Sequence, residues 1–232
     1  GGKENAIPKE AKAVVSVRSC DATTFEQSIK ESEAVWMQEI SATEPHAKIE
    51  LEKTDAAADK VLNSHSTANV IYALWLSPDG VYKMSQDIKG MVQTSLNLGT
   101  AYLDADKLVY KYLIRSNTAA GKKLLLERVT TFVKHLSGKV VTMSDYPAWE
   151  YKSDSQLRKI CVDSFTNVYG HEPEVTSIHA GLECGILAGK MPGVDMISFG
   201  PTLESVHTPD ECMDVASVER TWEYLMEILK SL

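Results

Sequence analysis

Two short apolar runs near the carboxyl end constrain the fold of this chain more than any other feature. Residues 175–178 and 194–199 are rich in β-branched side chains and too short for helices, so both are expected to be strands. Residues 182–190 between them have helix length and carry Gly185 and Gly189, spaced for a close backbone approach. A strand, a helix and a strand in this order predict parallel strands of a larger sheet, the rest of which is missing from the sequence.

The turn that follows the second run is the strongest candidate for chemistry. Gly200-Pro201 is expected to end the strand, and Pro209 restricts Thr208 to an extended conformation. His207 should therefore be held on a rigid loop beyond the sheet edge, where α/β proteins place functional residues. A histidine held in this way suits a metal ion, although a lone histidine is more often a capping or surface residue.

The first part of the chain predicts a different architecture. Strands are expected at residues 13–18, 48–53 and 140–143, and two long strands at 92–103 and 107–115 should form a hairpin through a tight turn. Apolar stripes predict helices at about 24–41, with Thr23 or Thr24 as cap, from Ser66 to Trp75, and around 125–136. These elements favour an antiparallel sheet with helices on one face.

From about residue 147 the character changes. One helix is lined by Leu157, Cys161, Phe165 and Val168, and the parallel unit described above follows it. The closing helix has a stripe made of Val215, Val218, Trp222, Leu225 and Leu229. The fold class is therefore α/β overall, with an α+β region followed by part of a parallel α/β region.

Composition narrows the possible partners. The 232 residues carry 24 Lys and Arg against 32 Asp and Glu, a net charge of −8, without a basic block, which argues against nucleic acid or an anionic membrane surface. No apolar run is long enough to span a bilayer. The four cysteines show no CxxC spacing and no signal peptide is recognisable, so reduced thiols in a cytoplasmic protein are expected. The start at Gly1-Gly2, without an initiator Met, is interpreted as a fragment boundary.

Several motifs in a fixed order carry a family resemblance. They are GGKENAIPKEA at residues 1–11, PDGV at 78–81, TSLNLG at 94–99, IRS at 114–116, HAGLECG at 179–185, SFGP at 198–201 and HTPDE at 207–211. Over nearly its whole length the chain thereby resembles the aminoacyl-histidine dipeptidases, the peptidase D or cytosolic carnosinase-like members of the di-zinc aminoacylase superfamily. Each motif is weak alone, but together and in this order they are specific.

The resemblance implies a two-domain peptidase about twice this length, in which a lid domain is inserted into a zinc-binding domain. On that pattern residues 1–146 are most of a lid and dimerisation-type domain, and 147–232 are the returning segment of the catalytic domain. The other metal ligands and the catalytic glutamate would lie upstream of Gly1, so no catalytic residue is expected in this chain. The expected partners are a dipeptide, the missing N-terminal half and a second subunit of a homodimer, with two zinc ions per intact site.

The resemblance also implies individual site residues. His207 matches a zinc ligand, with Asp210 or Glu211 either orienting it or simply beginning the last helix. Arg115 matches the anchor of the substrate carboxylate, with Arg18 as its competitor and a surface ion pair as the plain alternative for both. Asn5 matches an asparagine that binds substrate or its oxyanion. Gly181 and Glu183 are further substrate-binding candidates, although a strand-to-helix turn and a helix start would explain them equally.

The function implied is a cytoplasmic zinc metallodipeptidase that hydrolyses Xaa-His dipeptides, with the isolated chain inactive. Two alternatives stay open. The chain is a catalytically inert lid and dimerisation piece, or the intact protein is an aminoacylase or carboxypeptidase of the same superfamily.

Overall fold

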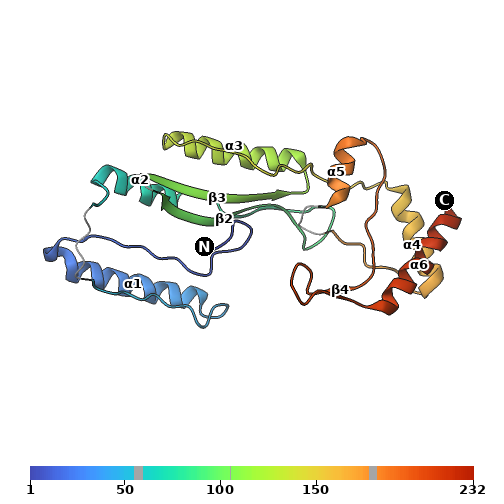
Figure 1. The fold of residues 1–232 in the computed structure, drawn as a ribbon, viewed down its shortest axis with the longest axis horizontal. Coiled ribbons are helices and arrows are strands. Elements are labelled where there is room, and N and C mark those ends of the chain that lie inside the picture. Colours follow the sequence, from blue (N-terminus) through green and yellow to red (C-terminus); the bar gives the residue numbers. More distant parts are fainter. Residues whose placement is uncertain (55–59, 105, 178–181) are drawn as a thin grey trace. The chain divides into compact units, whose positions relative to one another are not determined.

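A computed structural model describes residues 1–54, 60–104, 106–177 and 182–232 (Figure 1). The backbone contacts divide the chain into two compact units. One unit is Lys9–Tyr72, and the other consists of Gly1–Pro8 together with Ala73–Leu232. None of the helices in the described part of the chain has the length and apolar character that a membrane crossing requires.

The predicted helices of the N-terminal region are confirmed. A 3-10 turn, η1 (Ser19–Asp21), leads into α1 (Ala22–Ile40), and α2 spans Ser64–Trp75. The expected cap of α1 is wrong, because Asp21 occupies the N-cap position and makes no side-chain cap bond. In α2 the Asn63 side chain accepts a hydrogen bond from the backbone of Ser66, at 2.8 Å, so the helix begins earlier than predicted.

The strands predicted at residues 13–18 and 48–53 are wrong: neither segment belongs to a sheet among the described residues. In the second segment the backbone N–H of Ile49 donates to the Glu33 carboxylate on α1 at 3.0 Å. A strand persists only when its backbone groups pair with a neighbouring strand. Alternation of apolar and charged residues does not supply that neighbour.

The predicted hairpin is confirmed and supplies two strands of a three-stranded antiparallel sheet, with β2 at its centre. β2 (Val92–Asp104) pairs with β3 (Lys107–Ser116), and the sheet order is β1-β2-β3. The short edge strand β1 (Gly80–Met84) was not predicted, because Ser77 to Gly80 reads as a turn and the strand that follows is brief. A register shift interrupts the β2–β3 pairing between Leu98 and Thr100.

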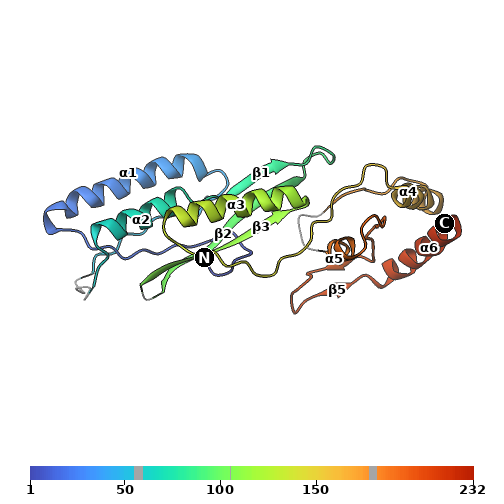
Figure 2. The same cartoon turned by 90° about the horizontal axis from the view of Figure 1, so that it is seen from above.

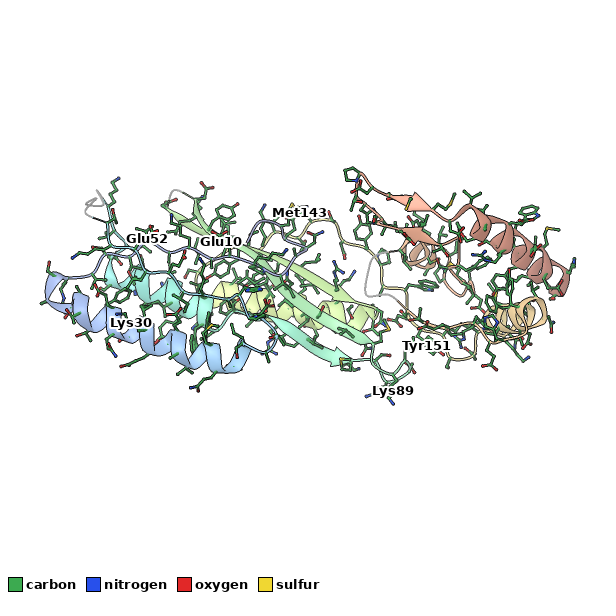
Figure 3. All side chains as sticks on the ribbon, turned by 90° about the horizontal axis from the view of Figure 1, so that it is seen from below. Glu10, Lys30, Glu52, Lys89, Met143 and Tyr151 are labelled. Atoms are coloured by element: carbon green, nitrogen blue, oxygen red, sulfur yellow. The ribbon has the colours of Figure 1, made fainter. Side chains whose placement is uncertain are left out.

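One helix covers a face of this sheet. α3 (Ala119–His135) lies along β2 and β3 (Figure 2). Its Leu125 and Val129 are buried with Leu96 of β2 in the core of this region. The strand predicted at residues 140–143 is wrong: these residues are unpaired, and Met143 is 78% exposed (Figure 3).

The described residues of the C-terminal region form three helices and one small hairpin. The helices are α4 (Gln156–Tyr169), α5 (Glu183–Lys190) and α6 (Val215–Ser231), and the hairpin pairs β4 (Leu203–Glu204) with β5 (Cys212–Met213). α4 and α6 pack together through Cys161, Tyr224 and Ile228. The helices and small antiparallel sheets place the chain in the α/β class, as predicted.

The predicted parallel strands do not form. Residues 194–199 and the described residues 175–177 have no strand partner in the part of the chain that the structure describes, and Ile178 lies outside that part. The close approach predicted from the glycines of α5 is confirmed. A Cβ on Gly185 would lie 2.8 Å from the Pro147 carbonyl oxygen, and one on Gly189 would lie 2.8 Å from the Pro147 ring.

Candidate functional site

Arg115 occupies a half-buried position on β3, directly opposite Ser95 on β2. Successive side chains of a strand point to opposite faces, so Arg115, Ser95 and the next pair along, Asn97 and Leu113, share one face. Leu96 points the other way, into the core beneath α3. Arg115 therefore emerges on the face of the sheet that α3 does not cover.

Asn97 fixes the N-terminal turn that carries Asn5. Its amide nitrogen donates to the backbone carbonyls of Glu4, at 3.3 Å, and Ala6, at 2.9 Å. These two carbonyls flank Asn5 on either side. Gly99, two residues further along β2, permits the approach, because a Cβ there would lie 2.4 Å from the Glu4 carbonyl oxygen. The turn is thus clamped to β2 from two positions.

The sheet therefore brings two predicted site residues to one face. Arg115 lies opposite Ser95, and Asn97, which holds the turn around Asn5, is the next β2 residue on that face. The sequence motif containing Asn97 was recognised, but the role of Asn97 was missed. The sequence signal that could have indicated this role is an asparagine inside a long predicted strand, because asparagine is depleted in strands.

Arg18 lies in the other compact unit and has a different environment. Its side chain is 82% exposed and its Nε lies 2.6 Å from the Asp21 carboxylate, three residues away on the same turn. The strand that it was expected to end does not form. This geometry is that of a surface ion pair, which was the plain alternative for this residue.

His207 lies in the turn that connects β4 and β5. Its backbone has φ +66°, a left-handed conformation that costs a non-glycine residue about 1–3 kcal/mol unless surrounding bonds hold it. The Glu211 carboxylate accepts from the His207 N–H at 2.7 Å, and the Thr208 hydroxyl donates to the Ser205 carbonyl at 2.6 Å. Glu211 does not begin the last helix, because the N-cap of α6 is Asp214. Hydrogen bonds within the turn therefore fix the His207 backbone.

The metal implied by the resemblance has an incomplete set of ligands here. Among the described residues, no three His, Cys, Asp or Glu side chains come together in a way that could hold a metal ion. A catalytic zinc site uses three protein ligands or so, and His207 supplies at most one. The described residues of this chain do not fit a complete zinc site.

The remaining candidates are Gly181, which precedes α5 in the sequence, and Glu183, which is its first residue. Gly181 and the neighbouring His179 lie outside the described residues. Glu183 is the exposed first residue of α5, where a negative charge is favoured by the helix dipole. Its position is explained by the helix, and its substrate-binding role stays a prediction.

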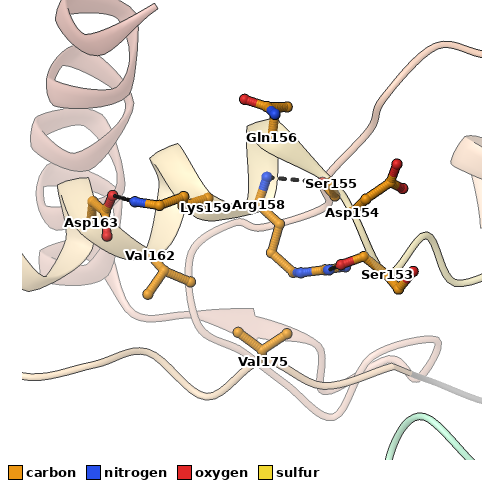
Figure 4. Close-up of a pocket in the computed structure, with 9 residues that line it drawn as sticks. All are labelled: Ser153, Asp154, Ser155, Gln156, Arg158, Lys159, Val162, Asp163 and Val175. Atoms are coloured by element: carbon orange, nitrogen blue, oxygen red, sulfur yellow. Dashed lines mark hydrogen bonds and ion pairs between the residues drawn. The ribbon is translucent and has the colours of Figure 1, made fainter.

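A cavity of about 440 Å³ lies at the start of α4 (Figure 4). Three of its charged side chains, those of Arg158, Lys159 and Asp163, already have partners within the chain. The Arg158 guanidinium donates to the carbonyls of Lys152 and Ser153, and Lys159 forms an ion pair with Asp163 at 2.6 Å. Among the described residues, no predicted site residue lines this cavity, so it is separate from the face that carries Arg115.

Residues 7–231 match peptidase family M20/M25/M40. The chain is 30% identical over 233 residues to the cytosol non-specific dipeptidase of Escherichia coli (strain K12), an alignment that covers 100% of this chain and 48% of that protein. The chain therefore spans about half the length of this curated relative.

Two solved structures have a similar fold. The crystal structure of aminoacylhistidine dipeptidase from Vibrio alginolyticus matches with a TM-score of 0.84 and 28% identity, covering 92% of this chain and 44% of that chain. Aminopeptidase PepT from Bacillus cereus ATCC 10987 matches with a TM-score of 0.52 and 17% identity, covering 72% of this chain and 45% of that chain. The second likeness concerns the fold alone.

Proposed function

The chain belongs to peptidase family M20/M25/M40, and we propose that it is part of a metal-dependent dipeptidase that hydrolyses Xaa-His dipeptides. Peptidases of this family are generally metal-dependent. One similar protein is a non-specific dipeptidase and another is an aminoacylhistidine dipeptidase. Both names support a dipeptide substrate, and the preference for a C-terminal histidine is the finer part of the proposal.

The observation that carries this proposal is the shared sheet face of Arg115 and the Asn5 turn. A guanidinium binds a carboxylate through two parallel hydrogen bonds, so Arg115 would anchor the C-terminal carboxylate of the dipeptide. The Asn5 amide, on the turn that Asn97 holds to β2, would donate to the substrate carbonyl or to its developing oxyanion. Asn97 would act as a positioning residue, because it holds the turn rather than the substrate.

The proposal also assigns the metal ligands and the general base to two different parts of the longer polypeptide. His207 would be the one zinc ligand that this chain contributes. The other ligands and the general base would come from the part of the M20 polypeptide that this chain does not span, which is about half the length of the relatives. A cytoplasmic location, a homodimer and the roles of Gly181 and Glu183 stay predictions.

Zinc content and dipeptide hydrolysis test this proposal together. In the longer protein, His207→Ala should lower zinc content and reduce hydrolysis of Ala-His by more than about 100-fold, because loss of a ligand exceeds the cost of losing its supporting partners. His46→Ala, which changes an exposed histidine of the other compact unit, is the matched control and should change neither. Unchanged zinc stoichiometry in His207→Ala would remove this residue from the metal site.

The second candidate is a piece without activity of its own, and the incomplete ligand set favours it for the isolated chain. We expect this chain by itself to retain no stoichiometric zinc after dialysis against a weak chelator and to hydrolyse no dipeptide. An aminoacylase or a carboxypeptidase of the same family would instead cleave acylated amino acids or longer peptides faster than Ala-His.

A further inference from the structure

The PDGV motif at residues 78–81 marks the entry to β1, and the site described above does not use it. Pro78 is buried, Asp79 is exposed, and Gly80 is the first residue of the strand. Gly80 has φ +97°, a conformation that residues with a side chain rarely adopt, so a glycine is needed where the chain enters β1. Asp79 therefore stands on the turn before the strand.

The Asp79 carboxylate holds β2 beyond the point where β1 begins. Gly80, the first residue of β1, pairs with Leu96. Two residues further along β2, the backbone N–H of Leu98 donates to the Asp79 carboxylate at 2.7 Å. A hydrogen bond to an ionised acceptor is stronger than one to a neutral acceptor. The carboxylate therefore continues the hydrogen bonding of β2 past the end of its neighbouring strand.

Leu98 borders the register shift in the β2–β3 pairing. It pairs with Tyr112, and the pairing resumes one residue out of step after Gly99. Gly99 is thus the extra residue of a β-bulge, a feature that bends a strand and redirects the neighbouring side chains. Gly99 also lies against Glu4 of the N-terminal turn. The geometry of the bulge therefore sets the position of the turn that carries Asn5.

The turn before β1 holds both strands at this bulge. The Ser77 hydroxyl lies 2.7 Å from the Tyr112 hydroxyl, so a hydrogen bond ties the turn to β3. The Tyr112 ring packs against the core beneath α3. Asp79 ties the same turn to Leu98, the partner of Tyr112 in the sheet. Two contacts from one turn therefore fix the residue pair that precedes the bulge.

Asn97 lies directly before the residue that Asp79 holds. Its amide nitrogen donates to the carbonyls of Glu4 and Ala6, which flank Asn5. A short side chain reaches two carbonyls at once only from a narrow range of backbone positions, because hydrogen bonds weaken steeply with distance and angle. A series of contacts therefore runs from Asp79 through the β2 backbone and the Asn97 amide to the turn.

We propose that Asp79 is a positioning residue of the substrate-binding face, which fixes the β2 bulge and thereby sets the position of Asn5. The inference rests on the proposed function, in which the Asn5 amide donates to the substrate carbonyl or its oxyanion. Asp79 acts there through Leu98 and Asn97. A displaced donor stabilises the transition state less, so the loss of Asp79 should lower kcat and leave the contact between Arg115 and the substrate carboxylate intact.

Kinetics of Ala-His hydrolysis in the longer protein test this inference. Asp79→Ala should lower kcat roughly tenfold, because a displacement of about 1 Å can cost about 100-fold. The ratio of kcat/KM for Ala-His to kcat/KM for its amide should stay the same, since that ratio reports the Arg115 contact. Asp79→Asn keeps an acceptor oxygen and should restore most of kcat. Asp87→Ala changes an exposed aspartate on the loop after β1 and is the matched control, which should alter neither quantity.

A double-mutant cycle separates positioning from a merely structural role. Asn5→Ala should lower kcat by about 100–1000-fold, the usual cost of losing an oxyanion donor. Asp79→Ala added to Asn5→Ala should cost less than about twofold more, because the donor that Asp79 positions is gone. An equal cost of Asp79→Ala in both backgrounds would overturn the inference, and so would a failure of Asp79→Asn to restore kcat.

Trypsin cleavage after Lys3, read by mass spectrometry in the longer protein, reports on the turn independently of activity. Asp79→Ala should be cut there roughly fivefold faster or more, as should Asn97→Ala, whereas Asp87→Ala should match the parent protein. Faster cleavage of Asp79→Ala, together with an unchanged kcat in Asn5→Ala, would retain the positioning contact and refute the proposed role of Asn5. A lower kcat in Asn5→Ala, with Asp79→Ala changing neither cleavage nor kcat, would do the reverse.

Discussion

The β2–β3 hairpin contains its own hydrogen-bonding partner, whereas the strand-like segment at residues 194–199 has none in the described part of the chain. Both are apolar on one side, and both lie beneath a helix or a helix pair. Asp104 of β2 pairs with Lys107 of β3, and these residues are close in the sequence, so the pairing of the hairpin is local. A parallel strand depends on neighbours that are distant in the sequence. The hairpin region therefore supplies its own strand pairing, whereas a strand at residues 194–199 of the C-terminal region would require a neighbouring strand from elsewhere.

The largest effect on stability should come from the core of the hairpin region. Leu96 is 2% exposed and packs against α3, so Leu96→Ala should lower the free energy of unfolding of this chain by about 2–5 kcal/mol. Leu229→Ala, on an exposed face of α6, removes the same atoms from an exposed position and should cost less than about 0.5 kcal/mol. Urea unfolding of both variants measures the difference, and similar losses would contradict the distinction between the two regions.

A smaller effect should come from the carboxylate that ties residues 194–199 to α4. Asp195 accepts from the Ser155 hydroxyl and from the backbone N–H of Leu157, at 3.1 Å, at the start of that helix. Asp195→Asn should cost about 0.5–2 kcal/mol, the usual range for a helix cap. The loss should appear in the C-terminal helices and leave the hairpin region intact, which amide hydrogen exchange can resolve.

The same carboxylate makes the C-terminal region sensitive to acid. Burial raises the pKa of Asp195, but the hydrogen bonds from Leu157 and Ser155 outweigh it and hold the pKa below the ordinary value. Because the folded pKa is the lower one, the stabilisation is present above the unfolded pKa of about 3.9 and is lost as the pH falls through the folded pKa. Asp195→Asn should flatten this loss as the pH falls from about 5 through the unfolded and then the folded pKa. An unchanged acid profile in the variant would assign the loss to other groups.

The smallest effects should come from two buried threonines of β2. The Thr100 hydroxyl is buried without a hydrogen-bond partner, whereas Thr94 bonds the Ser116 hydroxyl at 2.9 Å. Thr100→Val should therefore be neutral or slightly stabilising, and Thr94→Val should cost about 1 kcal/mol, because it leaves Ser116 with one partner fewer. Thermal unfolding of the pair measures this difference, and a larger loss from Thr100→Val would show that its hydroxyl is satisfied in solution.

The sequence predicted most of the elements whose signals are local. The helices and the hairpin depend on periodicity, caps and turn residues within one stretch of sequence, and these helices and this hairpin are present in the structure. Residues 13–18, 48–53 and 140–143 were predicted as strands from their own residues, but none of them has a strand partner among the described residues. A pattern with a two-residue period cannot reveal whether a partner exists. In α6 the apolar stripe was recognised, but its period could not tell which neighbour buries it, and Tyr224 and Ile228 proved to be the buried side.

The candidate site was predicted residue by residue from a resemblance, not from physics alone. Arg115 and Asn5 are far apart in sequence, and only the strand register and the Asn97 clamp place them on one face. Asn97 itself was overlooked, because its contacts are to backbone carbonyls of another segment. Arg18 resembled Arg115 because each was predicted to lie at the end of a strand, but the strand predicted at residues 13–18 does not form.

Kinetics of the two arginine variants test the central claim, that the face of the β2–β3 hairpin that carries Arg115 binds the substrate carboxylate. In the longer protein, Arg115→Ala should remove about 1.5–3 kcal/mol of binding energy for Ala-His, which lowers kcat/KM by roughly one to two decades. The same change should scarcely affect kcat/KM for the corresponding dipeptide amide. Arg115→Lys should restore little, because an ammonium cannot form the two parallel bonds. Arg18→Ala, which loses only a surface ion pair, is the matched control and should change neither substrate. A selective loss on the free dipeptide in Arg18→Ala, with none in Arg115→Ala, would contradict the account.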